Sequence, residues 1–182
     1  DDYNDVAHLE FNNQPGDMVG QFIDHPDVVG HEVTEVSFYL YRLGGNTTDT
    51  YDIVVADSNA VIRHTFASNL KVSDLPLGSS PSDAVKITGD TGSYFFKSGD
   101  RIAVRADQAP SGYGIEIAQQ DAPSSSFDKG YRSVWGSFPS SAWGQWTNAT
   151  TKDLKFELVA LSCPGGCPPP RSRSDRCPTP IT

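Results

Sequence analysis

Cysteine is absent from the first 162 residues, and no apolar run approaches the roughly 20 residues that a membrane-spanning helix needs. A body of this size forms a core without disulfides or metals, and we expect no membrane span. Lysine and arginine are absent from residues 1–41, which carry nine acidic residues. The formal net charge is -9. The chain therefore lacks the basic face that binds phosphates, and we expect no nucleic-acid partner.

Signals for amphipathic helices are equally scarce, whereas glycine and proline are plentiful, with 16 and 13 residues among 182. A hydrophobic share of 37% with this many turn residues is typical of a one-domain β protein. The charge is unevenly distributed, because the first 41 residues are acidic and the last twenty contain three arginines against Asp175. Two interpretations stay open: an ordinary solvated surface, or head-to-tail complementarity between copies of the chain.

Short segments of alternating or β-branched residues, separated by turn signals, predict nine or ten strands. In the clearest of them Val36, Phe38 and Leu40 share one face, and residues 57–60 predict a tight turn between two others. The predicted strands cover 6–12, 18–23, 33–41, 51–56, 61–66, 84–88, 93–97, 101–105, 114–118 and 154–161. We therefore expect an all-β fold, a jelly-roll-like β-sandwich over residues 1–161.

Four segments follow one another in an order that resembles the jelly-roll modules of secreted prokaryotic proteins, which often lie beside cell-surface anchors or carbohydrate-active domains. These segments are Val-Ser-Phe-Tyr-Leu-Tyr-Arg at 36–42, the turn at 73–76, the stretch 97–104, and Trp146 leading to 153–158. The resemblance covers roughly residues 33 to 161. It implies the sandwich fold and brings no catalytic residues, and such modules serve several functions.

The composition changes abruptly in the last segment of the chain. Residues 162–182 hold six prolines and a single aliphatic residue, Ile181. Such a segment buries too little apolar surface to fold alone, so we expect an extended, polyproline-like tail. At about 3.1 Å per residue the tail spans roughly 60 Å, which takes it past its own domain. Arg171, Arg173, Arg176 and Ile181 are the candidate residues for docking on a neighbouring subunit.

All three cysteines, Cys163, Cys167 and Cys177, lie in this tail. Cys163 and Cys167 are spaced for a small disulfide loop, which leaves Cys177 odd. In an exported chain an odd cysteine indicates either pairing between chains or a free thiol, and both stay open here. The Cys-x3-Cys spacing, with no histidine nearby, gives little support to a metal site.

All three tryptophans lie in one run that begins at Tyr131 and ends at Trp146. Flat aromatic rings stack on sugars, so Trp135, Trp143 and Tyr131 are candidate contacts for a glycan. The competing interpretation is structural: Trp135 and Trp146 close the sandwich core while Trp143 shields a loop.

Two sequons, at Asn46 and Asn148, are candidate glycosylation sites. The first residue is Asp1 rather than methionine, a start that a processed export signal leaves, as does any other trimming of the chain. These features favour an extracellular or cell-surface location.

Signatures of catalysis are missing from the sequence. There is no Gly-x-Ser-x-Gly elbow, no phosphate-binding loop and no His-x-x-x-His pair, so we expect no enzyme. Turn aspartates offer the hard oxygen ligands that calcium prefers. They form two groups, Asp1, Asp2 and Asp5, and Asp49, Asp52 and Asp57. No specific loop spacing accompanies them, so we predict no cofactor and leave a structural calcium open.

Together these observations predict an extracellular structural subunit that assembles with copies of itself into a filament or surface array, with a terminal segment docking on a neighbour. The alternative is a non-catalytic carbohydrate-binding module, in which the tail is a linker and the aromatic run is the ligand face.

Overall fold

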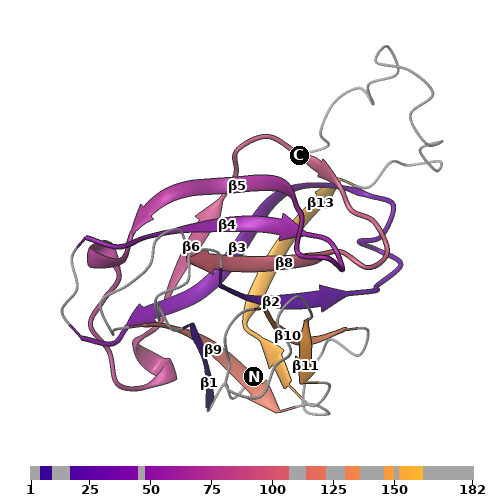
Figure 1. Ribbon diagram of the computed structural model, residues 1–182. Coiled ribbons are helices and arrows are strands. Elements are labelled where there is room, and N and C mark those ends of the chain that lie inside the picture. Colours follow the sequence, from indigo (N-terminus) through magenta and orange to yellow (C-terminus); the bar gives the residue numbers. More distant parts are fainter. Residues whose placement is uncertain are drawn as a thin grey trace.

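A computed structural model of the protein describes residues 5–9, 17–44, 48–106, 114–121, 130–135, 146–149 and 152–161. These residues form an all-β fold of two antiparallel sheets (Figure 1). The strands are β1 (Asp5–Leu9), β2 (Met18–Ile23), β3 (Glu32–Arg42), β4 (Thr50–Ala56), β5 (Ile62–Lys71), β6 (Val85–Gly89), β7 (Tyr94–Phe95), β8 (Arg101–Ala106), β9 (Ile115–Asp121), β10 (Gly130–Trp135), β11 (Thr147–Ala149), β12 (Lys152–Leu154) and β13 (Phe156–Leu161). Two short 3-10 turns, η1 (Val72–Asp74) and η2 (Pro81–Asp83), lie between β5 and β6.

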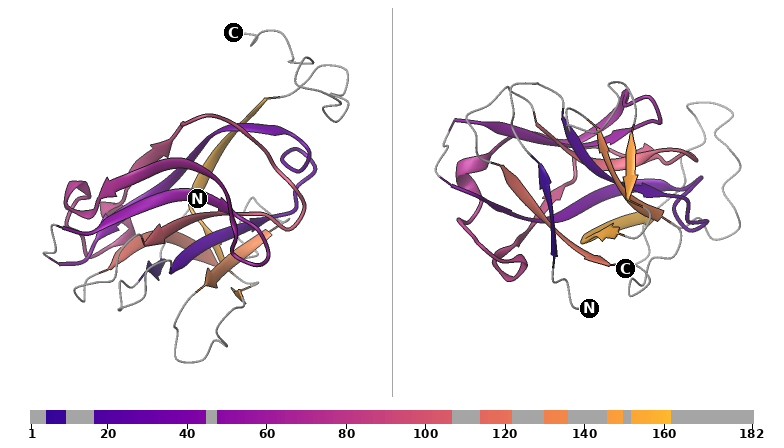
Figure 2. Two further views of the ribbon diagram at one scale, coloured as in Figure 1. Left: turned by 45° about the horizontal axis from the view of Figure 1, so that its top comes forward. Right: turned by 60° about the horizontal axis from the view of Figure 1, so that its bottom comes forward.

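The six-stranded sheet has the order β11-β10-β2-β8-β4-β5. In the seven-stranded sheet β3 is central: β6 and β7 pair with one of its edges, β13 and β9 pair with the other, and β1 lies beyond β9. In Figure 1 the strands β4, β5 and β8 run across the view and cross the steeper β13, and Figure 2 shows the same crossing layers from two further directions. The fold is therefore sandwich-like.

The core lies between the two sheets and is built from alternate residues of each strand. Val36, Phe38 and Leu40 of β3 are fully buried there, as the alternation predicts, and they belong to one cluster with Ile53 and Val55 of β4. Burying one such side chain contributes about 1.5–3 kcal/mol to folding. The sequence-predicted inward face of this strand is confirmed.

The six-stranded sheet is also buried on its outer face, where Met18, Val54, Ala56 and Ala103 form a second apolar cluster. Every residue of β4 after Thr50 is buried. A strand that is covered on both faces loses its polar-apolar alternation and reads as a continuous apolar run. This explains the sequence Ile-Val-Val-Ala at the end of β4.

The last strand of the chain is bent at the fork where β9 diverges from β3 in the seven-stranded sheet. β9 pairs with the end of β3 and then diverges from it, and β12 pairs with β9 while β13 pairs with the rest of β3. Lys155 lies at the apex of this fork, between β12 and β13. Its backbone N–H donates to the Ala118 carbonyl (2.7 Å), and its carbonyl accepts from the Tyr39 N–H (3.4 Å). The bend therefore keeps both pairings hydrogen-bonded.

A glutamine links the two sheets inside the core. Gln21 of β2 is fully buried. Its Nε2 donates to Asp153 Oδ1 (2.6 Å), and its Oε1 accepts from the Leu154 backbone N–H (2.9 Å). One side chain of the six-stranded sheet thus holds β12 of the other sheet in register.

Most strands lie where the sequence predicts them, and β2 coincides with its predicted range, 18–23. Three of the differences have their cause in the tertiary structure. The predicted strand 154–161 is divided at Lys155 by the fork, and the predicted strand 93–97 is reduced to the two residues of β7. β10 was not predicted, because its small residue Ser133 occupies a fully buried position where periodicity expects an apolar one.

Within the described part of the chain, no helix is long and apolar enough to cross a membrane.

Substitution of Gly20 by alanine is expected to lower the free energy of unfolding by about 1–3 kcal/mol. A Cβ at this position meets the Ile102 carbonyl oxygen at 2.6 Å and the Ala103 Cβ at 2.9 Å. The double variant Gly20→Ala/Ala103→Gly relieves only the second contact and should recover only part of the loss. Urea unfolding of the three proteins measures this, and equal midpoints for Gly20→Ala and wild type would contradict the close packing of β2 on β8.

Replacing Gln21 by leucine keeps its volume but leaves a buried carboxylate oxygen and a buried backbone N–H without their partner. We expect a loss of about 2–4 kcal/mol in guanidinium unfolding. The double variant Gln21→Leu/Asp153→Leu also removes the carboxylate that Gln21→Leu leaves without a donor. Its loss of unfolding free energy should therefore be smaller than the sum of the two single losses. Strictly additive losses would show that Gln21 and Asp153 do not act together.

Candidate functional site

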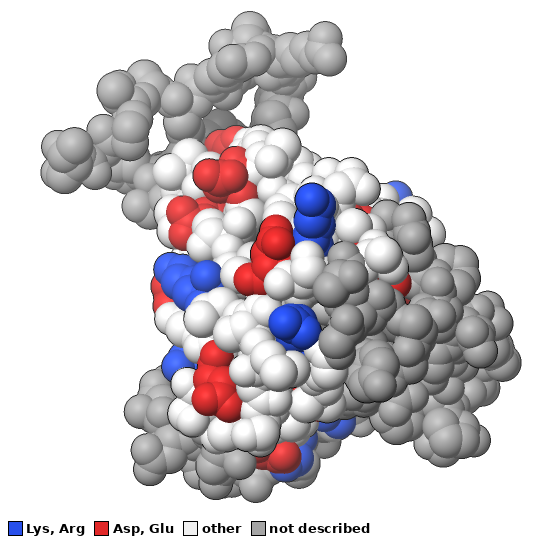
Figure 3. All heavy atoms as spheres, turned by 90° about the vertical axis from the view of Figure 1, so that its left-hand side faces the viewer, with Lys and Arg blue, Asp and Glu red and all other residues white. Residues whose placement is uncertain are grey.

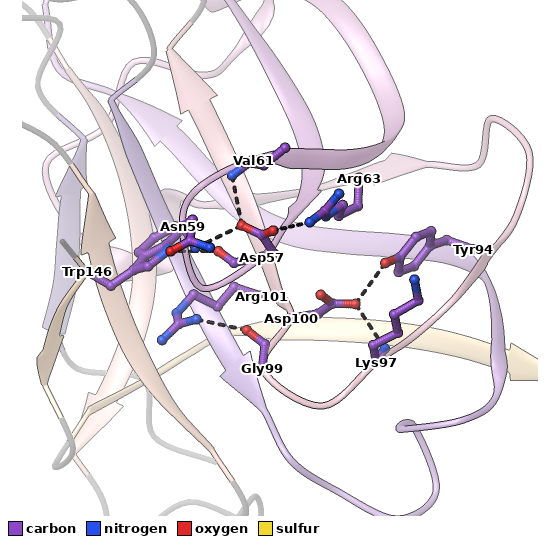
Figure 4. A network of polar contacts seen from close by, with 10 residues as sticks. All are labelled: Asp57, Asn59, Val61, Arg63, Tyr94, Lys97, Gly99, Asp100, Arg101 and Trp146. Carbon is purple, nitrogen blue, oxygen red and sulfur yellow. Dashed lines mark hydrogen bonds and ion pairs between the residues drawn. The ribbon is translucent and has the colours of Figure 1, made fainter. Parts of the chain in front are cut away.

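Two regions of the described surface are the candidates for a functional site. The first, the Trp146 corner, comprises Phe22, Asp57, Arg101, Trp135 and Trp146 on the outer face of the six-stranded sheet. Figure 4 shows Asp57, Arg101 and Trp146 of this corner. The second, the β13 face, comprises Glu32, Glu35, Phe95, Val159 and Leu161 on the outer face of the seven-stranded sheet.

The hairpin between β4 and β5 supplies the acid of the Trp146 corner. Asp57 Oδ1 accepts from the backbone N–H groups of Asn59 (2.8 Å) and Val61 (3.0 Å), and Ala60 adopts a positive φ of 58°. Arg63 pairs with the other carboxylate oxygen. Burial raises the pKa of Asp57, but the hydrogen bonds and Arg63 outweigh it, and the pKa lies below its ordinary value. The carboxylate is thus committed to holding the turn.

Arg101, the first residue of β8, provides the cation of the corner. Its guanidinium lies 5.1 Å from the centre of the Phe22 ring and 4.9 Å from that of Trp146. Its Nε donates to Ser133 Oγ (3.1 Å), and a terminal nitrogen donates to the Gly99 carbonyl (2.9 Å). Because Arg101 is only 5% exposed, its charge is stabilised by aromatic faces and oxygen acceptors of the protein itself.

The tryptophans of the corner take part in packing. Trp135 and Trp146 lie with ring centres 5.6 Å apart, and both pack against the outer apolar cluster of the six-stranded sheet. The Trp146 indole N–H donates to the Asp57 carbonyl (3.0 Å). Both rings are partly exposed. The corner therefore joins the aromatic residues to the hairpin turn by contacts that leave only part of each ring for a ligand.

A second acid lies beside the corner. Asp100 Oδ2 accepts from the Tyr94 hydroxyl (3.0 Å) and from the Lys97 backbone N–H (2.9 Å) (Figure 4). Desolvation raises the pKa of Asp100. Burial, together with the hydrogen bond to Asp100, raises the pKa of Tyr94 to about 12. The two groups fix the turn before β8, in which Gly99 has a positive φ.

The β13 face differs from the corner because its apolar groups are exposed. Phe95, Val159 and Leu161 are 40%, 45% and 39% exposed. Cross-strand pairing places Leu161, Glu32 and Phe95 in one row, and Val159 opposite Glu35 in the next. Partners in an antiparallel ladder project from the same face. The β13 face is thus an apolar and acidic surface at the end of β13.

β13 also presents a free edge. It pairs with β3 on one side, and no strand among the described residues pairs with its other side. Glu157 near its start is engaged: Lys86 Nζ lies 2.6 Å from its carboxylate, and the Tyr39 hydroxyl donates to it. These two hydrogen bonds lower the pKa of the Glu157 carboxyl, and the one from Lys86 has the larger effect. Lys86 belongs to β6, on the far side of β3, so this ion pair crosses the sheet face and does not cover the open edge of β13.

Charged side chains elsewhere are mixed in sign. On the face shown in Figure 3, acidic and basic groups are interspersed, and the acidic groups prevail toward the top of the view.

The structure places the sequence-predicted site residues as follows. Trp135 lies in the Trp146 corner, and Tyr131 belongs to β10, although its side chain is outside the described part. Asn148 of β11 is exposed, and its Oδ1 accepts from Ser133 Oγ (2.9 Å). The remaining candidates lie outside the described residues: Asn46, Trp143, Cys163, Cys167, Arg171, Arg173, Arg176, Cys177 and Ile181.

The candidate calcium ligands that the structure describes have protein partners. Asp52 pairs with Arg105 (3.2 Å), Asp57 pairs with Arg63, and Asp5 pairs with Lys152 (2.9 Å). Among the described residues, no group of three or more His, Cys, Asp or Glu side chains is arranged to hold a metal ion.

Two features escaped the sequence analysis. Arg101 opens an apolar strand, where an arginine is ordinarily solvated, and nothing local indicates its two aromatic neighbours. The exposure of Val159 and Leu161 does have a local signal, because they continue the outward face of Glu157 in the alternation of the last strand.

Comparison of the chain with models of known protein families, with curated proteins and with solved structures gives no match. The class of the protein is therefore set by its fold: an all-β, sandwich-like protein of two antiparallel sheets.

Removing the Asp57 side chain should loosen the hairpin. We expect Asp57→Ala to lose about 1–2 kcal/mol of unfolding free energy, because two backbone N–H groups lose their acceptor. Asp57→Asn keeps that acceptor and should lose less.

The two variants also differ from wild type in pH dependence. Since the folded-state pKa of Asp57 lies below its ordinary value, its contribution is present above that ordinary value and is lost as the pH falls through the lowered pKa. Asp57→Asn lacks this acid-side loss. Urea midpoints between about pH 2 and pH 7, which span the ordinary aspartate pKa of about 3.9 and the range below it, test the sign. A steeper acid-side loss in Asp57→Asn than in wild type would contradict it.

Proposed function

We propose that the protein is an extracellular structural subunit that assembles with copies of itself into a filament or surface array. In this proposal residues 1–161 are a jelly-roll-like body, and residues 162–182 are an extended segment that docks on a neighbouring subunit. The observation that carries the proposal is the end of β13, where an open strand edge and two exposed aliphatic residues lie immediately before the tail.

Open edges of this kind join β domains. A free edge offers unpaired N–H and C=O groups along the strand, and natural monomers ordinarily protect such an edge with charge, proline or a covering loop. Val159 and Leu161 offer no such protection. A contact between one terminus and a different surface of the next copy is heterologous, and where the rotation between copies does not close a ring it produces an open chain of subunits.

The tail cysteines fit a covalent role in the same assembly. Cys163 and Cys167 are four residues apart and suit a local loop, which leaves Cys177 without a partner among the three cysteines of residues 1–182. We propose that Cys177 forms a disulfide with a neighbouring copy.

The alternative function is binding of a glycan at the aromatic run. The partly exposed rings of Trp135 and Trp146 favour it, as does the exposed Asn148 nearby on β11. Against it, Trp146 is engaged by Asp57 and Arg101. A carbohydrate-binding platform presents a flat ring face to solvent, whereas these rings pack on the sheet.

Native mass and negative-stain microscopy of the full chain decide between the two functions. Filaments, with a ladder of multimers on a non-reducing gel that collapses on reduction, are the expected result. A single monomer band with an empty grid would remove the assembly proposal. Quenching of tryptophan fluorescence by soluble oligosaccharides in that same sample would then support the glycan module.

Cysteine variants test the covalent link separately. Cys177→Ser should abolish the ladder, while the matched variant Cys163→Ser/Cys167→Ser should keep it. A ladder that persists in Cys177→Ser would contradict the assignment of the intermolecular bond to Cys177.

A further inference from the structure

We infer that the β13 face is the surface on which residues 162–182 of a second copy dock. This inference rests on the proposed function and names its receiving surface. The occupant is a basic, proline-rich segment, and the surface that receives it is apolar and acidic.

The shape of the β13 face suits an extended segment. Its first row crosses three adjacent strands, from Leu161 of β13 through Glu32 of β3 to Phe95 of β7. With strands about 4.8 Å apart, this row is roughly 10 Å wide. Val159 and Glu35 form the neighbouring row. Proline-rich segments bind by laying prolines on exposed aromatic and aliphatic groups, and Phe95 with the two β13 side chains provides them.

The charges of the two surfaces are complementary. The β13 face contains two glutamates, and the tail contains three arginines against one aspartate. Glu32 accepts a hydrogen bond from the Ser93 hydroxyl, which holds the carboxylate near the row. The charge of Glu35 acts on Lys86, but the ion pair of Lys86 is with Glu157 and not with Glu35. The glutamates are thus available to the guanidinium groups of a docking tail.

The length of the tail favours a neighbour as the source. The tail leaves the body at Leu161, which itself belongs to the β13 face, and Arg171 follows ten residues later. In a polyproline-like conformation this distance is about 30 Å. The triple proline at 168–170, directly before Arg171, stiffens the segment. An extended tail would therefore carry the arginines past the chain's own β13 face and within reach of that of the next copy.

A charge-exchange experiment with full-length chains tests this inference. In the face variant, Glu32→Arg/Glu35→Arg, both the face and the tail are basic. In the tail variant, Arg171→Glu/Arg173→Glu/Arg176→Glu, both are acidic. Each variant alone should need at least about tenfold more protein than wild type to form filaments. An equimolar mixture should assemble near the wild-type concentration, because each tail then meets a face of opposite charge.

Three controls make the result specific. Asp74→Arg/Ser79→Arg adds positive charge beside η1 and η2, at the end of β3 remote from Glu32 (Figure 1), and should assemble like wild type. Glu32→Gln/Glu35→Gln removes the charge conservatively and should weaken assembly less than the reversal does. Urea unfolding of each variant establishes that it is folded, and rescue by mixing establishes it independently.

The outcomes separate this inference from the proposed function. If wild type forms filaments and the face variant assembles equally well, the tail docks elsewhere, and the filament function stands without this inference. If the mixture stays unassembled, the contact is made within one chain or through other groups, and the inference is wrong. If wild type itself forms no assembly, both proposals fail.

Discussion

A buried glutamine controls how the two sheets of this protein meet. Gln21 donates to Asp153 and accepts from the backbone of Leu154, so one side chain holds two consecutive residues of the opposite sheet. An amide and a carboxylate in a core are costly unless they satisfy each other. This requirement fixes the position of β12, and with it the place at which the last strand bends. β13 begins directly after that bend and carries the exposed surface at its end.

The six-stranded sheet shows how a small protein uses both faces of one layer. Its inner face packs on the other sheet, and its outer face is covered in part by Trp135 and Trp146. Arg101 lies between two aromatic rings at the margin of this cover. The polar groups there form hydrogen bonds mainly with one another and with the hairpin turn at Asp57. The aromatic run therefore serves mainly in packing, and only part of each ring is left exposed for contact with a glycan.

The β13 face has the opposite character. Its aliphatic and aromatic groups are exposed, its strand edge is open within the described part of the chain, and its glutamates are partly exposed. The adjoining tail is too poor in apolar residues to fold by itself. In the proposed assembly, docking would order the tail and would cover the exposed apolar surface of the face. The proposed assembly satisfies both requirements with one contact.

The sequence by itself determined the β class, the ranges of strands such as β2 and β3, the inward face of Val36, Phe38 and Leu40, and the change in composition after residue 161. These properties are local, because side-chain alternation and turn chemistry act over a few residues. The link of Gln21 to Asp153, the neighbours of Arg101, the strand β10 and the break at Lys155 were decided only by the tertiary structure. Each depends on partners far apart in the chain, and no local pattern encodes which strands become neighbours.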